Sequence, residues 1–148
     1  MTPHDPDFIV WRLAALFLLA SVLGWGVDTI LRSIRRRRFA PIRRVPFSPL
    51  YGLASLGLWA APPSIATAGW LVQFTAFALG ICVFEYVAGA AILRARGTRM
   101  WDYTDRYFHV HGHTDLFHFF LWGALGLVAY RWALPAVAQV VGLAGPLR

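Results

Sequence analysis

The feature that most constrains this chain is a forty-residue stretch, Val45 to Phe84, without a single Asp, Glu, Lys, Arg or His. A soluble fold of 148 residues cannot hide so much continuous apolar surface, whereas the hydrocarbon core of a bilayer solvates it. Trp, Tyr and Phe make up 16% of the chain, which suits rings placed at the lipid headgroups. The sequence therefore predicts an integral membrane protein.

A proline pair divides this stretch into two spans. Pro62 and Pro63 cannot donate the helical hydrogen bond and disfavour helix before them, so we expect a hairpin there. Further apolar runs precede and follow the hairpin, and Pro135 is expected to end the last of them. We predict an all-α, polytopic membrane fold: a four-transmembrane-helix bundle with an interfacial segment and a short amphiphilic C-terminal tail, forming a single transmembrane domain over residues 1–148. The expected spans are 8–31, 47–61, 65–93 and 116–134.

The arginines indicate the topology. All fourteen basic residues are Arg, seven of them between Arg32 and Arg44, and three more are Arg94, Arg96 and Arg99. By the positive-inside rule the loops 32–46 and 94–115 are cytoplasmic and both termini lie outside. The N-terminus lacks the basic region of a signal peptide, so the first span is expected to be retained. We expect a multi-pass protein of a bacterial inner (plasma) membrane, and we assign the net charge of +7 to topology rather than to nucleic-acid binding.

Two carboxylates fall inside predicted spans. Glu85 lies eight residues before the end of its span at Leu93, about 12 Å along a helix. A carboxylate that faces lipid at such a depth costs at least about 2.5 kcal/mol, so it should face the bundle, either as a functional group or as a structural hydrogen-bonding group. Asp28 lies one turn before Arg32, and either a local ion pair or a role in a site accounts for it.

The densest polar cluster lies before the last span. If this segment is extended, His109, His111, His113 and Asp115 share a face; if it is helical, His111, Asp115 and His118 do. Two or three imidazoles and a carboxylate suit zinc, iron or another divalent ion, with Asp115 as a ligand or as the group that orients a His. The spacing matches no established motif. The alternatives are an interfacial segment whose imidazoles bond headgroups or backbone, and, less favoured, haem binding or proton relay.

Missing motifs exclude some functions. The sequence contains no Lys, so it has no P-loop lysine for nucleotide hydrolysis and no lysine for a Schiff base. Cys82 is the single cysteine and cannot form an internal disulfide. The sequence leaves open whether the protein is an enzyme. Its cofactor is unknown: a divalent metal is the main candidate, haem is less favoured and no nucleotide is expected.

Several short motifs together resemble a known family. They are Gly24-Trp25 with Asp28, Pro46-Phe47-Ser48-Pro49-Leu50-Tyr51-Gly52, Glu85-Tyr86, Trp101-Asp102-Tyr103-Thr104, Phe108 with Gly112, and Trp122-Gly123. This set is similar to the CmpB-type family of small multi-span membrane proteins, described as putative ABC-transporter type IV. The resemblance covers about residues 21–135 and implies a compact multi-helix membrane domain. The chain departs from the family pattern at Asp28, where Glu is typical, at His109 and His113, where Asn and Arg are typical, and at Leu93, where a second acid is expected.

These residues converge on one structural hypothesis, a polar pocket open to the cytoplasm. We predict that it binds an amphiphilic small molecule or a lipid headgroup, as part of a permease-like protein or of a membrane enzyme. The alternatives are a metal-binding enzyme or transporter that uses the histidine cluster, and a non-catalytic accessory subunit of a larger membrane complex. The expected partners are membrane lipids and either further copies of the chain or a larger complex. The predicted ligand-binding residues are Asp28, Arg43, Arg44, Tyr51, Glu85, Tyr86, Trp101, Asp102 and Tyr103.

Overall fold

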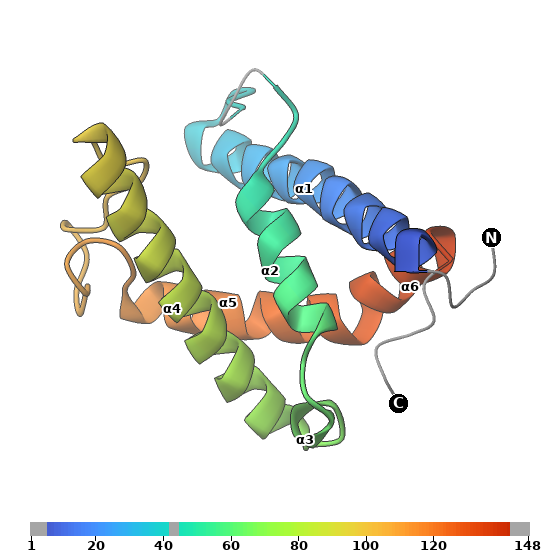
Figure 1. Cartoon of the computed structure of the whole chain (residues 1–148). Helices are drawn as coiled ribbons and strands as arrows, with labels where there is room; N and C mark the ends of the chain where they lie inside the picture. The colour runs from blue at the N-terminus through green and yellow to red at the C-terminus, as the bar shows by residue number, and fades with distance from the viewer. Residues whose placement is uncertain (1–5, 42–44, 143–148) are drawn as a thin grey trace. The chain divides into compact units, whose positions relative to one another are not determined.

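The structure, a computed structural model, describes residues 6–41 and 45–142 (Figure 1). It is helical throughout these ranges, apart from loops and one isolated bridge between Val110 and Thr114. The elements are α1 (Pro6–Arg36), α2 (Pro49–Trp59), α3 (Pro63–Ala66), α4 (Trp70–Arg96), α5 (Leu116–Val128), the π-helical turn η1 (Ala129–Ala133) and α6 (Leu134–Val140). The all-α prediction is confirmed.

Three helical stretches in the described residues are long and apolar enough to cross a membrane: Ile9–Ile34, Trp70–Arg96 and Leu116–Val140. The four-span bundle is not confirmed. The predicted span 47–61 forms only α2, whose 11 residues fall short of the roughly 20 that a bilayer core requires. The predicted span 65–93 is interrupted after α3, and α4 begins at Trp70 with Gly69 in an extended conformation before it.

Pro135 does not end the last span as predicted. A proline inside an α-helix lacks the donor for the residue four positions earlier and collides with its carbonyl. Here the wider turn of η1 directly precedes the proline, which falls in the first turn of α6. The helix therefore continues to Val140, and the first part of the predicted tail is helical rather than a surface segment. Residues 143–148 lie outside the described residues.

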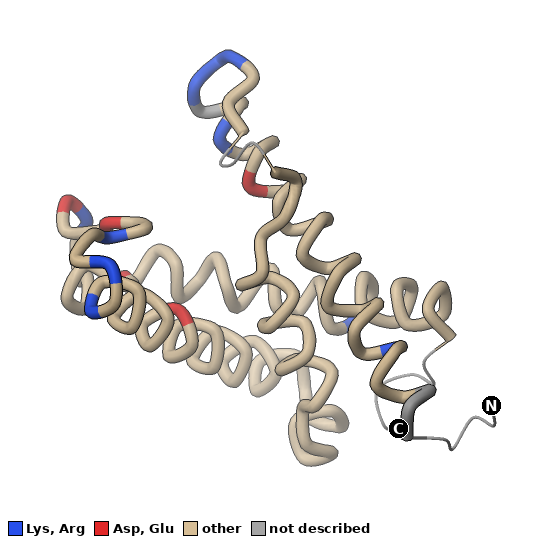
Figure 2. Tube along the Cα trace, turned by 45° about the horizontal axis from the view of Figure 1, so that its top comes forward, with Lys and Arg blue, Asp and Glu red and all other residues tan. Residues whose placement is uncertain are grey.

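The chain divides into two compact units, residues 1–61 with 132–148, and residues 62–131. The expectation of one transmembrane domain over residues 1–148 stays a prediction. Figure 2 shows the charged residues of the first unit gathered mainly at one end of α1, and those of the second mainly at the end of α4 and in the loop after it. This is the distribution expected of helices whose middle segments contact lipid.

In the first unit, α1 and α2 approach closely through small residues. Gly24 lies against the ring of Tyr51, and Gly52 lies against Phe17 and Ser21. The backbone N–H of Ser48 donates to the carbonyl of Ser21 at 3.0 Å, just before α2 begins. Apolar packing and a backbone hydrogen bond therefore hold the two helices together.

In the second unit, α4 packs against α5 through phenylalanines of α4 and glycines of α5. Phe74 lies against Gly123, and Phe77 lies against Gly126 and stacks at 5.0 Å on Tyr130. This packing fixes the position of α5 along the axis of α4. The outward side chains of α4, among them Leu71, Leu79, Val83 and Val87, are exposed, as lipid-facing residues should be.

Gln73 ties the far end of this unit together. Its Nε2 donates to the carbonyls of Ile65 (3.1 Å) and Ala66 (3.0 Å), and its Oε1 accepts from Nε of Arg131 at 2.9 Å. One buried amide thus satisfies the open C-terminal carbonyls of α3 and joins α3, α4 and η1.

The α1–α2 packing predicts opposite results for two glycines of α2. A Cβ on Gly52 would lie 2.5 Å from Phe17 Cδ2, whereas a Cβ on Gly57 would meet open space. Gly52→Ala should lower the free energy of unfolding by about 1–3 kcal/mol through overpacking. Gly57→Ala should be neutral or stabilising by up to about 1 kcal/mol, because alanine favours helix. Thermal unfolding in detergent measures both, and equal loss of stability in the two variants would contradict the packing.

Candidate functional site

The loop between α4 and α5, residues 97–115, folds back onto α4. Within the loop, Nε1 of Trp101 donates to the carbonyl of His113 at 2.9 Å, and the N–H of Tyr103 donates to the carbonyl of Gly112 at 3.0 Å. The ring of His113 lies against Gly89 of α4, where a Cβ would come within 2.7 Å of its Nδ1. A side chain at position 89 would therefore push the loop off the helix.

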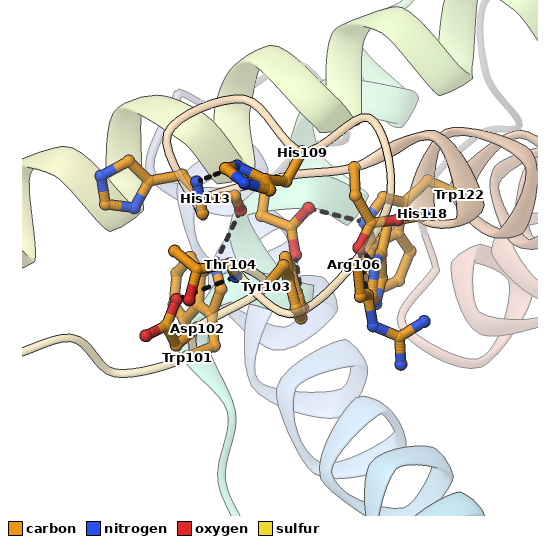
Figure 3. Close-up of polar contacts among 12 residues, drawn as sticks. Trp101, Asp102, Tyr103, Thr104, Arg106, His109, His113, His118 and Trp122 are labelled. Carbon is orange, nitrogen blue, oxygen red and sulfur yellow. Dashed lines mark hydrogen bonds and ion pairs between the residues drawn. The ribbon is translucent and has the colours of Figure 1, made fainter.

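Glu85 is the acid that this loop covers. Its side chain is 8% exposed, and its two oxygens accept hydrogen bonds from different elements. The Tyr103 hydroxyl donates to Oε1 at 3.1 Å from the loop, and the Trp122 indole N–H donates to Oε2 at 3.0 Å from α5 (Figure 3). The sequence prediction that Glu85 turns away from lipid agrees with this geometry.

Asp115 organises the start of α5. One carboxylate oxygen accepts the backbone N–H of His118 at 2.8 Å, which caps the helix. The other lies 2.8 Å from Nδ1 of His118 and 3.7 Å from Nε of Arg106. If Nδ1 carries the proton, as a carboxylate partner favours, Nε2 is left as the basic nitrogen of the ring.

Tyr103 connects the two acids. Its ring stacks on the imidazole of His118 with centroids 4.0 Å apart and planes at 21°, while its hydroxyl binds Glu85. Glu85, Tyr103, Arg106, Asp115, His118 and Trp122 thus form one group, here called the α4–α5 polar cluster. Figure 3 shows Tyr103 and Arg106 of the loop lying near His118 and Trp122 of α5. The cluster offers two carboxylates, one guanidinium and one imidazole in a small volume, a set that can bind a polar headgroup.

The histidines do not form the predicted metal cluster. No group of three or more His, Cys, Asp or Glu side chains that could hold an ion occurs in the part of the chain that the structure describes. The loop is neither extended nor helical there: Phe108, His111 and Gly112 have positive φ angles, so the predicted faces do not exist. Each imidazole meets a different partner: His109 accepts from the N–H of Gly112, His111 binds the Tyr86 hydroxyl at 2.9 Å, His113 faces Gly89, and His118 binds Asp115.

The other predicted ligand-binding residues divide between the units. In the first unit the Tyr51 hydroxyl donates to Asp28 at 2.7 Å. In the second, Glu85, Tyr86, Trp101 and Tyr103 lie on or under the loop, and Asp102 is on its exposed side. The Thr104 backbone N–H bonds to Asp102 and lowers the pKa of its carboxyl. Arg43 and Arg44 lie outside the described residues.

Sequence reasoning missed three members of the site. Trp122 follows His118 by one helical turn, and that i, i+4 spacing was an available signal. The sequence around Arg106 and Gly89 contains no such signal, because only the path of the loop brings these residues to the cluster.

These observations define a class: a helical membrane protein with a buried acid in a spanning helix and a polar cluster under the following loop. The chain belongs to the family described as "Putative ABC-transporter type IV" (ABC_trans_CmpB), whose model matches residues 15–146. The resemblance drawn from the short motifs is therefore confirmed. No curated protein and no solved structure matches the chain.

The donors to Glu85 predict a coupled stability effect. Trp122→Phe removes the N–H at Oε2 and leaves a buried acceptor unpaired, which should cost about 1–3 kcal/mol. In a Glu85→Leu background the same change should cost much less, because no carboxylate remains to be satisfied. A double-mutant cycle of thermal unfolding in detergent measures the coupling, and a coupling near zero would contradict the hydrogen bond.

His113 predicts a pH dependence of the loop. Burial, with smaller contributions from Arg99 and His111, lowers the pKa of His113 below its usual value. The unfolded loop therefore takes up a proton near pH 6.5 that the folded loop resists, so loop stability is complete above that pH and declines as the pH falls below it. Amide exchange at Val110 and Tyr103, corrected for intrinsic rates, should lose protection between about pH 7 and 5.

Two variants serve as the controls. His113→Gln should flatten the pH profile, and His109→Gln, at an exposed position, should keep it. A profile that His113→Gln leaves unchanged would assign the effect to another group.

Proposed function

We propose that this protein binds the polar headgroup of an amphiphilic molecule at the α4–α5 polar cluster, as a permease-like component of a bacterial inner membrane. The observation that carries the proposal is the environment of Glu85. The carboxylate is buried in a helix able to span the bilayer, yet both of its donors, Tyr103 and Trp122, belong to segments outside that helix. Ionisable groups kept within a membrane helix usually mark a substrate or ion pathway.

The chemistry of the cluster selects the class of ligand. A headgroup with hydroxyl or ammonium donors can replace the Tyr103 hydroxyl at Glu85 when the loop moves. Negative charge on the same headgroup suits the arginines nearby, which are Arg94, Arg96, Arg99 and Arg106. The apolar tail would remain among the exposed side chains of α4 and in the surrounding lipid. No reaction is proposed, and the histidine geometry does not favour a metal.

The family description adds a transport role to this proposal. The 148 residues contain no Lys, so the lysine of a nucleotide-hydrolysing P-loop would lie outside them. We therefore place the protein in a homo-oligomer or a larger complex, with its arginine-rich loops in the cytoplasm and both termini outside, as the positive-inside rule favours.

A second candidate is a non-catalytic subunit that packs against other membrane helices. It is favoured by one face of α4, where Gly80 is exposed, Ala76 lies one turn before it, and a Cβ on Gly80 would meet open space. Small residues on an exposed helix face allow close approach of a second helix. Purification of the chain only together with partners, with Glu85→Gln leaving the complex working, would support this candidate over the first.

Native mass spectrometry of gently solubilised protein tests the headgroup proposal. The wild type should retain a lipid-sized adduct, and Glu85→Gln should reduce its occupancy by about tenfold, the effect of losing one charged hydrogen bond. Asp105→Asn is the matched control, because it removes an exposed carboxylate from the same loop and should keep the adduct. Equal occupancy in the wild type and Glu85→Gln would exclude Glu85 from ligand binding.

A further inference from the structure

Arg106 is held at the boundary between the loop and α5. Its Nε lies 3.7 Å from the buried carboxylate of Asp115, and its guanidinium carbon lies 5.1 Å from the ring centre of Phe117 and 5.9 Å from that of Tyr103. These contacts use the inner edge of the guanidinium. Figure 3 shows the terminal nitrogens of Arg106 at the outer edge of the cluster, directed away from the other side chains drawn. The guanidinium of Arg106 is therefore held on its inner side, and its terminal N–H groups can still donate hydrogen bonds.

Exposed aromatic residues lie next to Arg106 in the sequence and at the start of α5. Phe117 and Phe120, each 57% exposed, lie in the first turns of α5, inside the candidate span Leu116–Val140. Tyr107 and Phe108 follow Arg106 directly and are 90% and 78% exposed. Arginine and aromatic residues at the junction between a candidate span and its connecting loop are typical of the level of the lipid headgroups.

The loop holds these rings outward by its own hydrogen bonds. The Val110 N–H donates to the Thr114 carbonyl at 2.8 Å, and the Arg106 N–H donates to the Tyr103 carbonyl at 2.9 Å. Phe108 adopts a left-handed φ of 56°, which a bulky residue rarely does. Three polar residues of the loop, His113, Thr114 and Asp115, are buried, whereas Asp102, Thr104, Asp105, His109 and His111 are exposed together with the rings. The outer side of the loop thus presents aromatic rings and polar groups together, a mixture that suits the headgroup region of a bilayer.

We propose that Arg106, Tyr107, Phe108, Phe117 and Phe120 form a docking surface for an anionic phospholipid of the host bilayer. The guanidinium binds the headgroup phosphate, for which its planar pair of donors is matched. The rings of α5 contact the acyl chain, and those of the loop lie among the headgroups. Exposed arginines at the end of α4, Arg94 and Arg96, add positive potential that favours an anionic lipid. This inference rests on the proposed function, because Arg106 also belongs to the α4–α5 polar cluster, and it names the bound group as the phosphate of an anionic phospholipid that lies outside the Glu85 carboxylate.

Spin-labelled lipids in reconstituted vesicles test the proposal. Electron paramagnetic resonance measures the motionally restricted fraction of spin-labelled phosphatidylglycerol and of spin-labelled phosphatidylcholine beside the protein. The wild type should favour phosphatidylglycerol by about fivefold, the ratio that one well-placed arginine supplies. Arg106→Gln should bring this ratio close to one. Arg106→Lys keeps the positive charge and should keep most of the ratio, but it should lower the restricted fraction of both lipids because it cannot bind phosphate in the bidentate mode.

Two further variants separate the docking surface from general electrostatics and from loop unfolding. Arg94→Gln removes an exposed arginine of the same region and should leave most of the preference. Phe108→Ala removes an exposed ring and should lower the association of both lipids without changing their ratio.

Three results would overturn the proposal: equal effects of Arg94→Gln and Arg106→Gln, a lipid ratio of one in the wild type, or no effect of Phe108→Ala. A ratio of one combined with selective binding of an acidic peptide would assign the surface to a protein partner. Because the readout is a lipid ratio, it is independent of the adduct measured with Glu85→Gln.

Discussion

The need to satisfy a carboxylate in an apolar helix constrains the whole second unit. Glu85 lies in α4, and both of the hydrogen bonds described for its carboxylate come from other segments. The bond from Trp122 requires α5 to lie against α4 at one height, and the bond from Tyr103 requires the loop to turn back. The glycines follow from the same requirement: Gly123 lets Phe74 approach α5, and Gly89 lets His113 approach α4.

Polar side chains join the elements of this unit at its two ends, and α4 exposes apolar side chains between them. Gln73 and Arg131 join the elements at the end near α3, and the α4–α5 polar cluster joins them at the loop. Where the acids are buried, their partners are a phenol, an indole, an imidazole and backbone amides, with Arg106 more distant. Phenol, indole and backbone amide donors stabilise a buried carboxylate without burying a second full charge, which is costly in an apolar medium.

The sequence predicted the parts that depend on polarity alone. The apolar runs located the three long helices, and the cost of a charge in lipid indicated that Glu85 turns inward. The family resemblance was also correct. The pairing of side chains was beyond the sequence, because it depends on the path of the loop. Positive φ angles at Phe108 and His111 rotate neighbouring residues in a way that neither a 2-residue nor a 3.6-residue period describes, so the histidines separate. The prediction of a second span, 47–61, is not confirmed for a different reason: apolar composition does not reveal that the helix begins at Pro49 and ends at Trp59.

The chain passes twice between its two units, and both passages lie at irregular backbone. One crossing falls at Pro62, and the other falls after Arg131, inside the π-helical turn. In a π turn the backbone hydrogen bonds join residues five apart, one more than in an α turn. A helix can bend there by changing the spacing of these bonds, without breaking a regular series of α-helical bonds. Both crossings thus lie where the helical backbone is already irregular.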